Sequence, residues 1–305
     1  MVRVACIGEC MIELSERADG SLSRSYGGDT LNTALYMARL GVAVDYVTAL
    51  GDDGWSDEMA TAWASEGIGT GQVVRMAGRL PGLYVIQTDA KGERRFQYWR
   101  DRAAARDLFD QPGTQALIDA LSRDYGLLYL SGITLSLYGE AGRERLFEAL
   151  DRARANGARL AFDTNFRVRG WPDRELAKRA YRQIIDRSDI VLASVEDLDL
   201  LFGDDGEQAL LDGGEPDELV LKLTRPACRV MVGGADTEVG ATPVPNVVDT
   251  TAAGDSFAAA YLAARLTGAD PEKAARSGHR LAGAVVQHRG AIIPRSAMPD
   301  GVFGA

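Results

Sequence analysis

Residues 249–262 read Asp-Thr-Thr-Ala-Ala-Gly-Asp-Ser-Phe-Ala-Ala-Ala-Tyr-Leu. The first half consists of small and turn-forming residues, whereas the second half continues as an almost wholly apolar helical run to about Leu266. A helix that is apolar on nearly every face is usually buried in the core of a larger protein. The pattern therefore predicts a core helix whose start, near residue 252, is held rigidly in place.

The start of this predicted helix has the features of an anion site. The first turn of a helix carries backbone N–H groups without internal partners, and the helix dipole makes that end attractive to anions. Ala252, Ala253 and Gly254 have almost no side chain, so a phosphate can reach their amides directly. Asp255 follows them and can accept a proton from an attacking hydroxyl, as phosphoryl transfer requires. The alternative is structural: a threonine at 250–251 caps a core helix and Asp255 complements its dipole.

The whole stretch resembles the C-terminal signature of the ribokinase/PfkB family of carbohydrate kinases. The resemblance implies that Asp255 is the catalytic base, and that Ala252, Ala253 and Gly254 line the anion hole for the transferred phosphoryl group. The family usually has a glycine where Ala252 stands. The resemblance also implies a ribokinase-like fold and the use of ATP and Mg²⁺, with a monovalent cation as a further candidate.

A second stretch, residues 27–34, tests the resemblance independently. It reads Gly-Gly-Asp-Thr-Leu-Asn-Thr-Ala and is similar to the N-terminal family signature, in the form met in the 2-keto-3-deoxygluconate kinase branch. Gly27 and Gly28 let the backbone approach a sugar closely, and the helix that follows presents Asn32 to its hydroxyls. The resemblance places Asp29 at the substrate as well. Two signatures in the expected order, about 220 residues apart, extend the resemblance over essentially the whole chain.

Composition narrows the class of protein. The chain has 305 residues, of which 46% are hydrophobic, enough for a substantial core in one large domain or two. The resemblance implies a single ribokinase-like kinase domain, residues 1–305. A formal charge of −10 without a basic run argues against a nucleic-acid partner, and the presence of only two histidines argues against a transition-metal site. No stretch resembles a signal peptide or approaches membrane-spanning length, so we expect a cytoplasmic protein without a membrane partner.

Hydrophobic periodicity predicts alternating strands and helices. Strands are expected at residues 2–7, 42–50, 127–130, 160–162, 190–192 and 219–221, and helices at 30–40, 55–63, 139–155, 173–187, 196–212 and 274–287. Such alternation implies right-handed β-α-β crossovers, and hence a three-layer α/β/α sandwich with a mostly parallel central sheet. Two hairpins, at about 11–27 and 81–101, turn at 18–20 and 89–92 and do not fit this rhythm. They are expected to form a small β-sheet lid.

The most informative clue to the substrate is the sequence Phe-Gln-Tyr-Trp-Arg at residues 96–100. A sugar acid needs a cation, ideally an arginine that offers paired donors to a carboxylate, whereas a neutral sugar needs hydroxyl partners. If Tyr98 and Arg100, separated by one residue, lie on one strand, they point the same way and form one face. Resemblance to the keto-deoxygluconate kinases places both at the substrate, together with Tyr84 and Arg167. Without that resemblance, an aromatic cross-strand stripe with an exposed arginine is the favoured interpretation.

Polar residues also follow one of the predicted buried strands. In open α/β sheets, ligands bind just past the carboxyl ends of the strands. The resemblance implies that Asn165 faces the nucleotide phosphates and that Arg167 bridges phosphate and substrate, while Asp163 can equally be a loop-capping residue. Farther along, residues 193–196, Ala-Ser-Val-Glu, stand where many relatives carry Asn-x-x-Glu, so Glu196 is kept and the asparagine is not. Because Mg²⁺ often keeps most of its waters, Glu196 is expected to act on it only indirectly.

Residues 222–227, Lys-Leu-Thr-Arg-Pro-Ala, resemble the nucleotide-binding Lys-x-Gly loop of the family, with Thr224 in place of its glycine. The helix expected at 274–287 covers the adenine in this arrangement. Surface or packing roles are expected for His279 and His288. The residues expected to contact ATP are Asn165, Arg167, Ser194, Lys222, Thr224, Ala227, Ala252 and Gly254.

Three functions fit these residues. The first is an ATP-dependent kinase that phosphorylates the 6-hydroxyl of 2-keto-3-deoxygluconate, with Asp255 as base. The second is the same scaffold acting on another sugar, such as fructose or ribose. Tyr98 and Arg100 argue against it, because a carboxylate pocket is left with unpaired buried charge by a neutral sugar. The third is a sugar-acid sensor that binds without phosphorylating.

Other nucleotide enzymes are disfavoured by the absence of their motifs. The first predicted strand leads into Gly-Glu-Cys-Met rather than Gly-x-Gly-x-x-Gly, which argues against a dehydrogenase, and no Walker sequence occurs. The expected partners are therefore a small sugar acid and ATP. An exposed lid sheet also favours pairing between copies of the chain, so we expect a homo-oligomer formed through the lid.

Overall fold

The computed structural model describes residues 2–17, 19–88, 94–212, 214 and 216–304. The turn predicted at residues 89–92 lies outside these ranges, and the turn predicted at 18–20 is described only in part. Among the helices of the described residues, none is long and apolar enough to cross a membrane.

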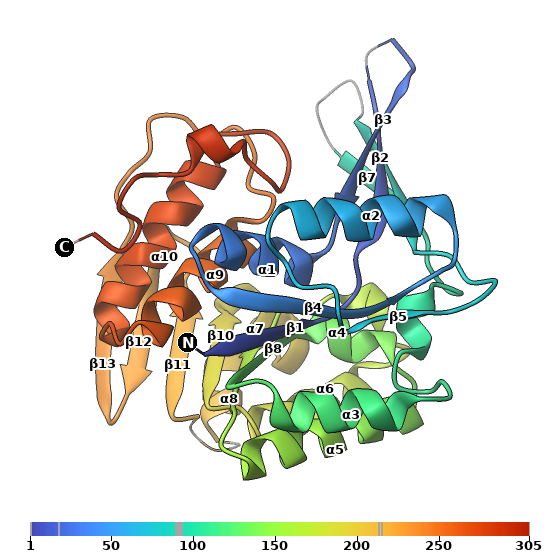
Figure 1. The fold of residues 1–305 in the computed structure, drawn as a ribbon. Coiled ribbons are helices and arrows are strands. Elements are labelled where there is room, and N and C mark those ends of the chain that lie inside the picture. Colours follow the sequence, from blue (N-terminus) through green and yellow to red (C-terminus); the bar gives the residue numbers. More distant parts are fainter. Residues whose placement is uncertain (1, 18, 89–93, 213, 215, 305) are drawn as a thin grey trace.

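A nine-stranded sheet forms the centre of the described chain (Figure 1). Its strands are, in spatial order, β13 (Ala235–Gly240), β12 (Ala227–Val232), β11 (Glu218–Lys222), β10 (Ile190–Ser194), β9 (Arg159–Asp163), β8 (Leu127–Ser131), β1 (Arg3–Ile7), β4 (Ala43–Leu50) and β5 (Val73–Arg75). From β11 to β5 all neighbours are parallel. Only β12 and β13, at one edge of the described sheet, pair antiparallel. The predicted mostly parallel sheet is confirmed.

Helices cover both faces of this sheet, each face with its own hydrophobic core. One face carries α1 (Asp29–Arg39), α2 (Gly54–Ser65), α9 (Ala253–Leu266) and α10 (Pro271–Val285). The other carries α3 (Thr114–Arg123), α4 (Gly132–Leu137), α5 (Glu140–Ala155), α6 (Arg174–Ile185), α7 (Val195–Phe202) and α8 (Gly206–Leu211). Short 3-10 turns are η1 (Ala104–Asp107), η2 (Val168–Gly170) and η3 (Arg295–Ala297). The layers confirm the predicted α/β/α sandwich.

The two predicted hairpins form a separate four-stranded sheet, which stands out from the main sheet in Figure 1. Its strands are, in spatial order, β3 (Leu22–Gly27), β2 (Met11–Glu16), β6 (Leu83–Thr88) and β7 (Arg94–Trp99). The hairpin partners are antiparallel, and β2 joins β6 in parallel. Both hairpins are confirmed, and their sheet is called the small sheet below.

The predicted element order differs from the structure in several places, and the short elements β5 and α4 were not predicted. The helix expected at 196–212 is two helices, α7 and α8, because the chain turns at Gly203, whose φ of 107° suits glycine but strains other residues. The edge hairpin β12–β13 was not predicted. It turns at Gly233 and Gly234, which both have positive φ, as the tight turns of hairpins require.

Helix α9 is buried along most of its length, as its apolar sequence predicts. All residues from 256 to 264 are buried. Near its end, Arg265 donates to both carboxylate oxygens of Glu218 on β11 at 2.7–3.1 Å, and Tyr261 Oη donates to the same carboxylate at 2.6 Å. Because Glu218 is buried, these bonds tie the helix firmly to the sheet. The position of Asp255 in the first turn is fixed accordingly.

Candidate active site

Two helix starts that are far apart in the sequence meet at one point. Helix α1 begins at Asp29, and α9 begins at Ala253. Asn32 Nδ2 donates to Asp255 Oδ2 at 2.8 Å, and Thr33 Oγ1 donates to the backbone carbonyl of Asp255 at 3.2 Å. The two sequence signatures therefore come together in one site.

Ala252, just before α9, has a left-handed backbone with φ 60° and ψ 16°. This conformation costs a residue with a Cβ about 1–2 kcal/mol, whereas glycine adopts it readily. This backbone geometry accounts for the glycine that is usual at this position in the family. It also shows that Ala252 adopts the left-handed conformation in its place. The residue at the N-cap of α9 is Ala252, whose side chain makes no capping hydrogen bond. The structural alternative is therefore wrong in placing a threonine at the N-cap, whereas Asp255 does lie in the first turn, as that alternative also expected.

The carboxyl group of Asp255 has a pKa well above its usual range. Burial is the main cause, and the nearby negative charges of Asp29 and Asp163 add to it. The hydrogen bond from Asn32 and the charge of Lys222 act in the opposite direction. Since a general base works best when its pKa lies near the operating pH, this environment suits proton abstraction.

Asp163 and Lys222 form an ion pair beside Asp255. Lys222 Nζ lies 2.9 Å from Asp163 Oδ2, and the two side chains are 20% and 6% exposed. Burial raises the pKa of Asp163, although the charge of Lys222 acts in the opposite direction. Burial alone would lower the pKa of Lys222, but its interaction with Asp163 is stronger, so the pKa of the lysine is raised. Asp163 Oδ1 accepts from the Asn165 backbone N–H at 3.2 Å. Asp163 thus caps the loop, and it also holds Lys222, which the sequence analysis missed.

Most of the expected site residues line one cavity of about 600 Å³. Those that do are Gly27, Gly28, Asp29, Asn32, Tyr84, Tyr98, Asn165, Arg167, Ser194, Glu196, Lys222, Ala252, Ala253, Gly254 and Asp255. Thr224 and Ala227 do not line it: Thr224 lies in the turn between β11 and β12, and Ala227 is buried in β12. Their contact with ATP stays a prediction.

Asn165 and Asp29 close the cavity between the loop after β9 and the start of α1. Asn165 Nδ2 donates to Asp29 Oδ2 at 2.7 Å. Asn165 has a φ of 25°, one of two non-glycine residues in the described chain with positive φ, the other being Ala252. Strained backbone of this kind concentrates at functional sites. Both such residues lie on this one cavity.

A second cavity, of about 1,040 Å³, adjoins the first beneath the small sheet and shares Asp29, Tyr98 and Arg167 with it. Tyr84 and Tyr98 are cross-strand neighbours with ring centroids 5.8 Å apart. The ring of Phe96 stacks on Tyr98 at 6.4 Å. The aromatic cross-strand stripe therefore exists, and it also faces a cavity.

Arg100 lines the second cavity, but its guanidinium is not free. It donates to Oε2 of Glu9, whose side chain is 1% exposed, while that of Arg100 is 20% exposed. The exposed arginine of the alternative interpretation is therefore wrong. Tyr84 is held in the same way, since its hydroxyl donates to Glu13.

The two glycines of the first signature serve protein packing in a way that the sequence analysis did not foresee. A Cβ on Gly28 would overlap the backbone carbonyl of Glu9, and a Cβ on Gly27 would overlap the hydroxyl of Tyr84. The missing side chain of Gly28 thus lets the start of α1 approach the chain at the end of β1, and that of Gly27 leaves room for Tyr84 within the small sheet. Both glycines also line the first cavity.

A family model described as pfkB family carbohydrate kinase matches residues 1–298. The chain belongs to this family. The 2-dehydro-3-deoxygluconokinase of Dickeya dadantii (strain 3937) is 45% identical over 306 residues, with 97% of this chain and 98% of the relative covered. The 2-dehydro-3-deoxygluconokinase of Escherichia coli (strain K12) is 43% identical over 307 residues, with 97% and 99% covered.

Solved structures agree with this assignment. The fructokinase with bound ATP from Xylella fastidiosa superposes with a TM-score of 0.83 at 26% identity, with 97% of this chain and 95% of that chain covered. The predicted membership of the ribokinase/PfkB family and the predicted ribokinase-like fold are both confirmed.

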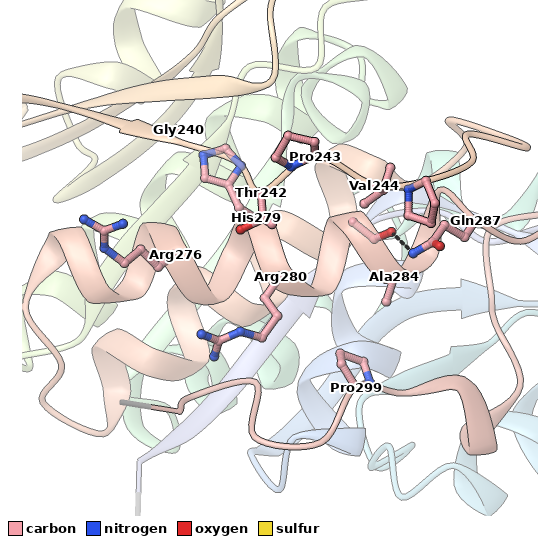
Figure 2. A pocket seen from close by; sticks show the side chains of 12 residues that line it. Gly240, Thr242, Pro243, Val244, Arg276, His279, Arg280, Ala284, Gln287 and Pro299 are labelled. Atoms are coloured by element: carbon pink, nitrogen blue, oxygen red, sulfur yellow. Dashed lines mark hydrogen bonds between the residues drawn. The ribbon is translucent and has the colours of Figure 1, made fainter.

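This pfkB kinase has a further cavity of about 470 Å³ beside α10, at the edge of the main sheet. Figure 2 shows residues 240–244 running along one side of α10, with His279 and Gln287 projecting from the helix. The ring of His279 packs on Phe257 at 5.0 Å, and its Nε2 lies 3.0 Å from the carbonyl of Val239. Burial lowers the pKa of His279. Its contacts are those of a packing residue.

The residues considered for the metal also have structural contacts in this pfkB kinase. Ser194 Oγ caps α7 by accepting from the backbone N–H of Asp197 at 3.1 Å, and Glu196 lines the first cavity. Arg167 Nη1 lies 3.4 Å from Asp197 Oδ1. Within the described residues, no group of three His, Cys, Asp or Glu side chains is arranged to hold a metal ion. An indirect role for Glu196 stays a prediction.

Glu9 was likewise not predicted as a partner in the site. Residues 4–12 are otherwise uncharged and almost entirely apolar, and Glu9 stands inside this run. A charged residue is rarely buried without a partner. That signal could have predicted a buried ion pair, although it could not have identified Arg100, 91 positions away, as the partner.

Proposed function

We propose that this pfkB kinase is a 2-dehydro-3-deoxygluconokinase. It transfers the γ-phosphoryl group of ATP to the 6-hydroxyl of 2-keto-3-deoxygluconate and forms 2-keto-3-deoxy-6-phosphogluconate. The observation that carries the proposal is the carboxylate of Asp255, held by Asn32 at the start of a buried helix and inside a cavity that continues to Tyr98 and Arg167. Relatives at 43–45% identity over nearly the whole chain carry this enzyme name.

In the proposed reaction, Asp255 accepts the proton of the sugar 6-hydroxyl. The freed electron pair of this oxygen attacks the γ-phosphorus, the bond from phosphorus to the β–γ bridging oxygen breaks, and ADP leaves with that electron pair. The backbone amides at Ala252, Ala253 and Gly254 face the charge that develops on the transferred group. Lys222, 3.7 Å from the point where a Cβ would stand on Gly254, adds a positive charge there.

The nucleotide is proposed to lie across the carboxyl ends of the central strands. Asn165, Arg167, Ser194 and Lys222 line the cavity at this edge, which supports contacts to the phosphates. The adenine of the nucleotide is assigned to the cavity beside α10, and Thr224 and Ala227 are proposed to contact the nucleotide on the way to that cavity.

Mg²⁺ neutralises phosphate charge in such reactions, and Glu196 would hold it through water. A monovalent cation is retained as a candidate and is tested by exchanging potassium for sodium.

The sugar is proposed to lie between the start of α1 and the small sheet. Gly27, Gly28, Asp29 and Asn32 form one wall, and Tyr84 and Tyr98 form the other. The carboxylate of the sugar is assigned to the end of the pocket at Arg100 and Arg167, because both arginines line the adjoining cavity. The small sheet then acts as a lid that excludes water from the transferred group.

The small sheet is also proposed as the contact between copies of the chain. Leu22, Phe96 and Trp99 are large apolar residues of this sheet and are 40–58% exposed. Pairing would cover these side chains and the sheet edge together. Light scattering of the purified protein tests this, and a mass of a single chain at all concentrations would contradict it.

The proposed function is tested by steady-state ATP consumption with 2-keto-3-deoxygluconate, its galacto epimer, gluconate and fructose side by side. We expect the keto-acids to give the highest kcat/KM. A preference for fructose would retain the kinase but contradict the substrate. Binding of the keto-acid without any ATP turnover would instead support a sugar-acid sensor on the same scaffold.

A further inference from the structure

The positive charge of Arg100 is already balanced inside the protein. Its partner Glu9 is almost fully buried and is held from the end of β1 against the second cavity. Each member of the pair keeps one buried polar atom, Glu9 Oε1 and Arg100 Nε, without a hydrogen-bond partner among the described residues. A substrate carboxylate that approaches Arg100 therefore meets a neutral pair with Glu9 rather than an uncompensated cation.

Arg106, in the short turn η1, adds a positive charge that the pair of Glu9 and Arg100 does not neutralise. It is half-buried and lines the same cavity as Glu9 and Arg100. Its charge favours the ionised form of Glu9, although burial raises the pKa of that carboxyl group overall. Within the described ranges, the guanidinium of Arg106 makes no hydrogen bond and no ion pair of its own. A partly desolvated cation without a partner is unfavourable unless a ligand supplies the negative charge.

The other cations around this cavity do not fill that role as well. Arg167 already has Asp197 as a partner at 3.4 Å, although its side chain is 60% exposed. Arg95 and Arg169 are exposed, so water screens their charges. Arg106 alone among the described cavity arginines combines partial burial with an uncommitted guanidinium.

We propose that Arg106 is a specificity-determining residue, whose charge makes the pocket select a sugar that carries a carboxylate over a neutral sugar of similar size. This inference rests on the proposed function and deepens it, since it assigns the net positive charge to Arg106 and leaves Arg100 as a hydrogen-bond donor held in place by Glu9. Glu9 is then a positioning residue.

The proposal is tested with Arg106→Gln, Arg106→Lys and the control Arg102→Gln. Arg102 lies in the same segment, is exposed and does not line the cavity. We expect Arg106→Gln to raise KM for 2-keto-3-deoxygluconate by at least about tenfold, the usual effect of losing a charged hydrogen-bonding group. In Arg106→Gln, KM for fructose and kcat for the keto-acid should stay within about twofold of wild type. Arg106→Lys should have a KM for the keto-acid between those of wild type and Arg106→Gln, and Arg102→Gln should have the KM and kcat of wild type. Equal effects on acid and neutral sugar, or none, would overturn the proposal.

A compensating variant separates charge balance from structural damage. Glu9→Gln frees the charge of Arg100, so Glu9→Gln/Arg106→Gln should regain selectivity for the acid that Arg106→Gln has lost. A double variant that discriminates no better than the single variant, although it melts at a similar temperature, would contradict the proposal.

Failure of the proposed function is recognised separately, in the wild type. Calorimetric binding of 2-keto-3-deoxygluconate and fructose without ATP measures selectivity even when turnover is absent. If the wild type binds the acid more tightly but does not phosphorylate it, the proposed function fails, while the Arg106→Gln binding ratio still decides the role of Arg106. If the wild type shows no preference for the acid in binding or turnover, both inferences fail.

Discussion

Asn32 Nδ2 lies 2.8 Å from Asp255 Oδ2, although 223 positions separate the two residues in the chain. Each sits in the first turn of a helix, α1 and α9, and both helices pack on the same face of the central sheet. The bond gives the carboxylate a fixed direction and favours its ionised form. Asp29, one turn before Asn32, has the opposite effect on the same carboxylate.

These opposing neighbours predict opposite shifts in the pH profile. Burial and Asp29 raise the pKa of Asp255, whereas Asn32 lowers it. Because the base must be ionised to accept a proton, kcat/KM falls on the acid side of this pKa. Asn32→Ala should therefore move the acid limb of kcat/KM to higher pH, and Asp29→Asn should move it to lower pH. Both variants lower the maximum, so the position of the limb is the informative quantity. Shifts in the same direction would contradict the assignment of Asp255 as the base.

The role of Asp255 in turnover is tested with Asp255→Asn. The amide keeps the shape of the side chain and can still accept from Asn32, but it cannot take a proton. We expect kcat to fall by about 10²–10⁴-fold, the range for loss of a general base, while calorimetric affinity for the sugar and for ATP stays within a few-fold. Asp204→Asn, at an exposed position of the α7–α8 loop, serves as the control. Near-normal turnover of Asp255→Asn would remove the residue from the mechanism.

The same substitution should stabilise the protein. The folded-state pKa of Asp255 lies above the unfolded value, so the folded carboxyl binds its proton more tightly, and stability is lost as the pH rises from the unfolded pKa through the folded one. Asp255→Asn removes this loss. We therefore expect a higher Tm than wild type, with a larger difference at pH 8 than at pH 5. A difference that is constant with pH, as for Asp204→Asn, would show that ionisation of Asp255 does not strain the fold.

The sequence predicted those parts of the site that depend on local pattern. The apolar run after Asp255 sufficed for the buried helix, and the small residues from Ala252 onward sufficed for its open start. Contacts between distant segments were not accessible in this way. The pairing of Glu9 with Arg100 and of Asp163 with Lys222 depends on which strand ends lie side by side, and hydrophobic periodicity does not contain that information.

For the fold, too, the sequence pattern predicted some elements and not others. Regular alternation predicted the parallel strands except the short edge strand β5, and it predicted the two outlying hairpins. It failed where one residue sets the backbone, as at Gly203, which ends α7 inside a continuous helical pattern. It also failed at the edge strands β12 and β13, where β13 is mostly exposed and carries little apolar alternation. The missed information in both cases was turn chemistry rather than hydrophobicity.

Ala252→Gly tests the strain at the start of α9. Release of the left-handed alanine gains about 1–2 kcal/mol, and the added freedom of glycine in the unfolded chain costs about 0.5–1 kcal/mol. We expect the free energy of unfolding, measured with urea, to stay unchanged or rise by about 1 kcal/mol, with kcat retained. Ala258→Gly, inside the same helix, is the matched control and should cost about 1 kcal/mol or more. Equal destabilisation by both variants would contradict the strain at Ala252.

The ion pair between Asp163 and Lys222 is tested with a single and a double variant. Lys222→Gln leaves the nearly buried Asp163 carboxylate without its partner, and such losses cost about 3–5 kcal/mol when the partner is fully buried. Lys222 keeps some exposure, so we expect the lower end, about 3 kcal/mol in the free energy of unfolding. Asp163→Asn/Lys222→Gln should recover most of this stability, because no uncompensated charge remains. Turnover should not recover, since the positive charge beside the start of α9 is missing in both variants. Recovery of kcat together with stability would show that Lys222 serves the fold alone.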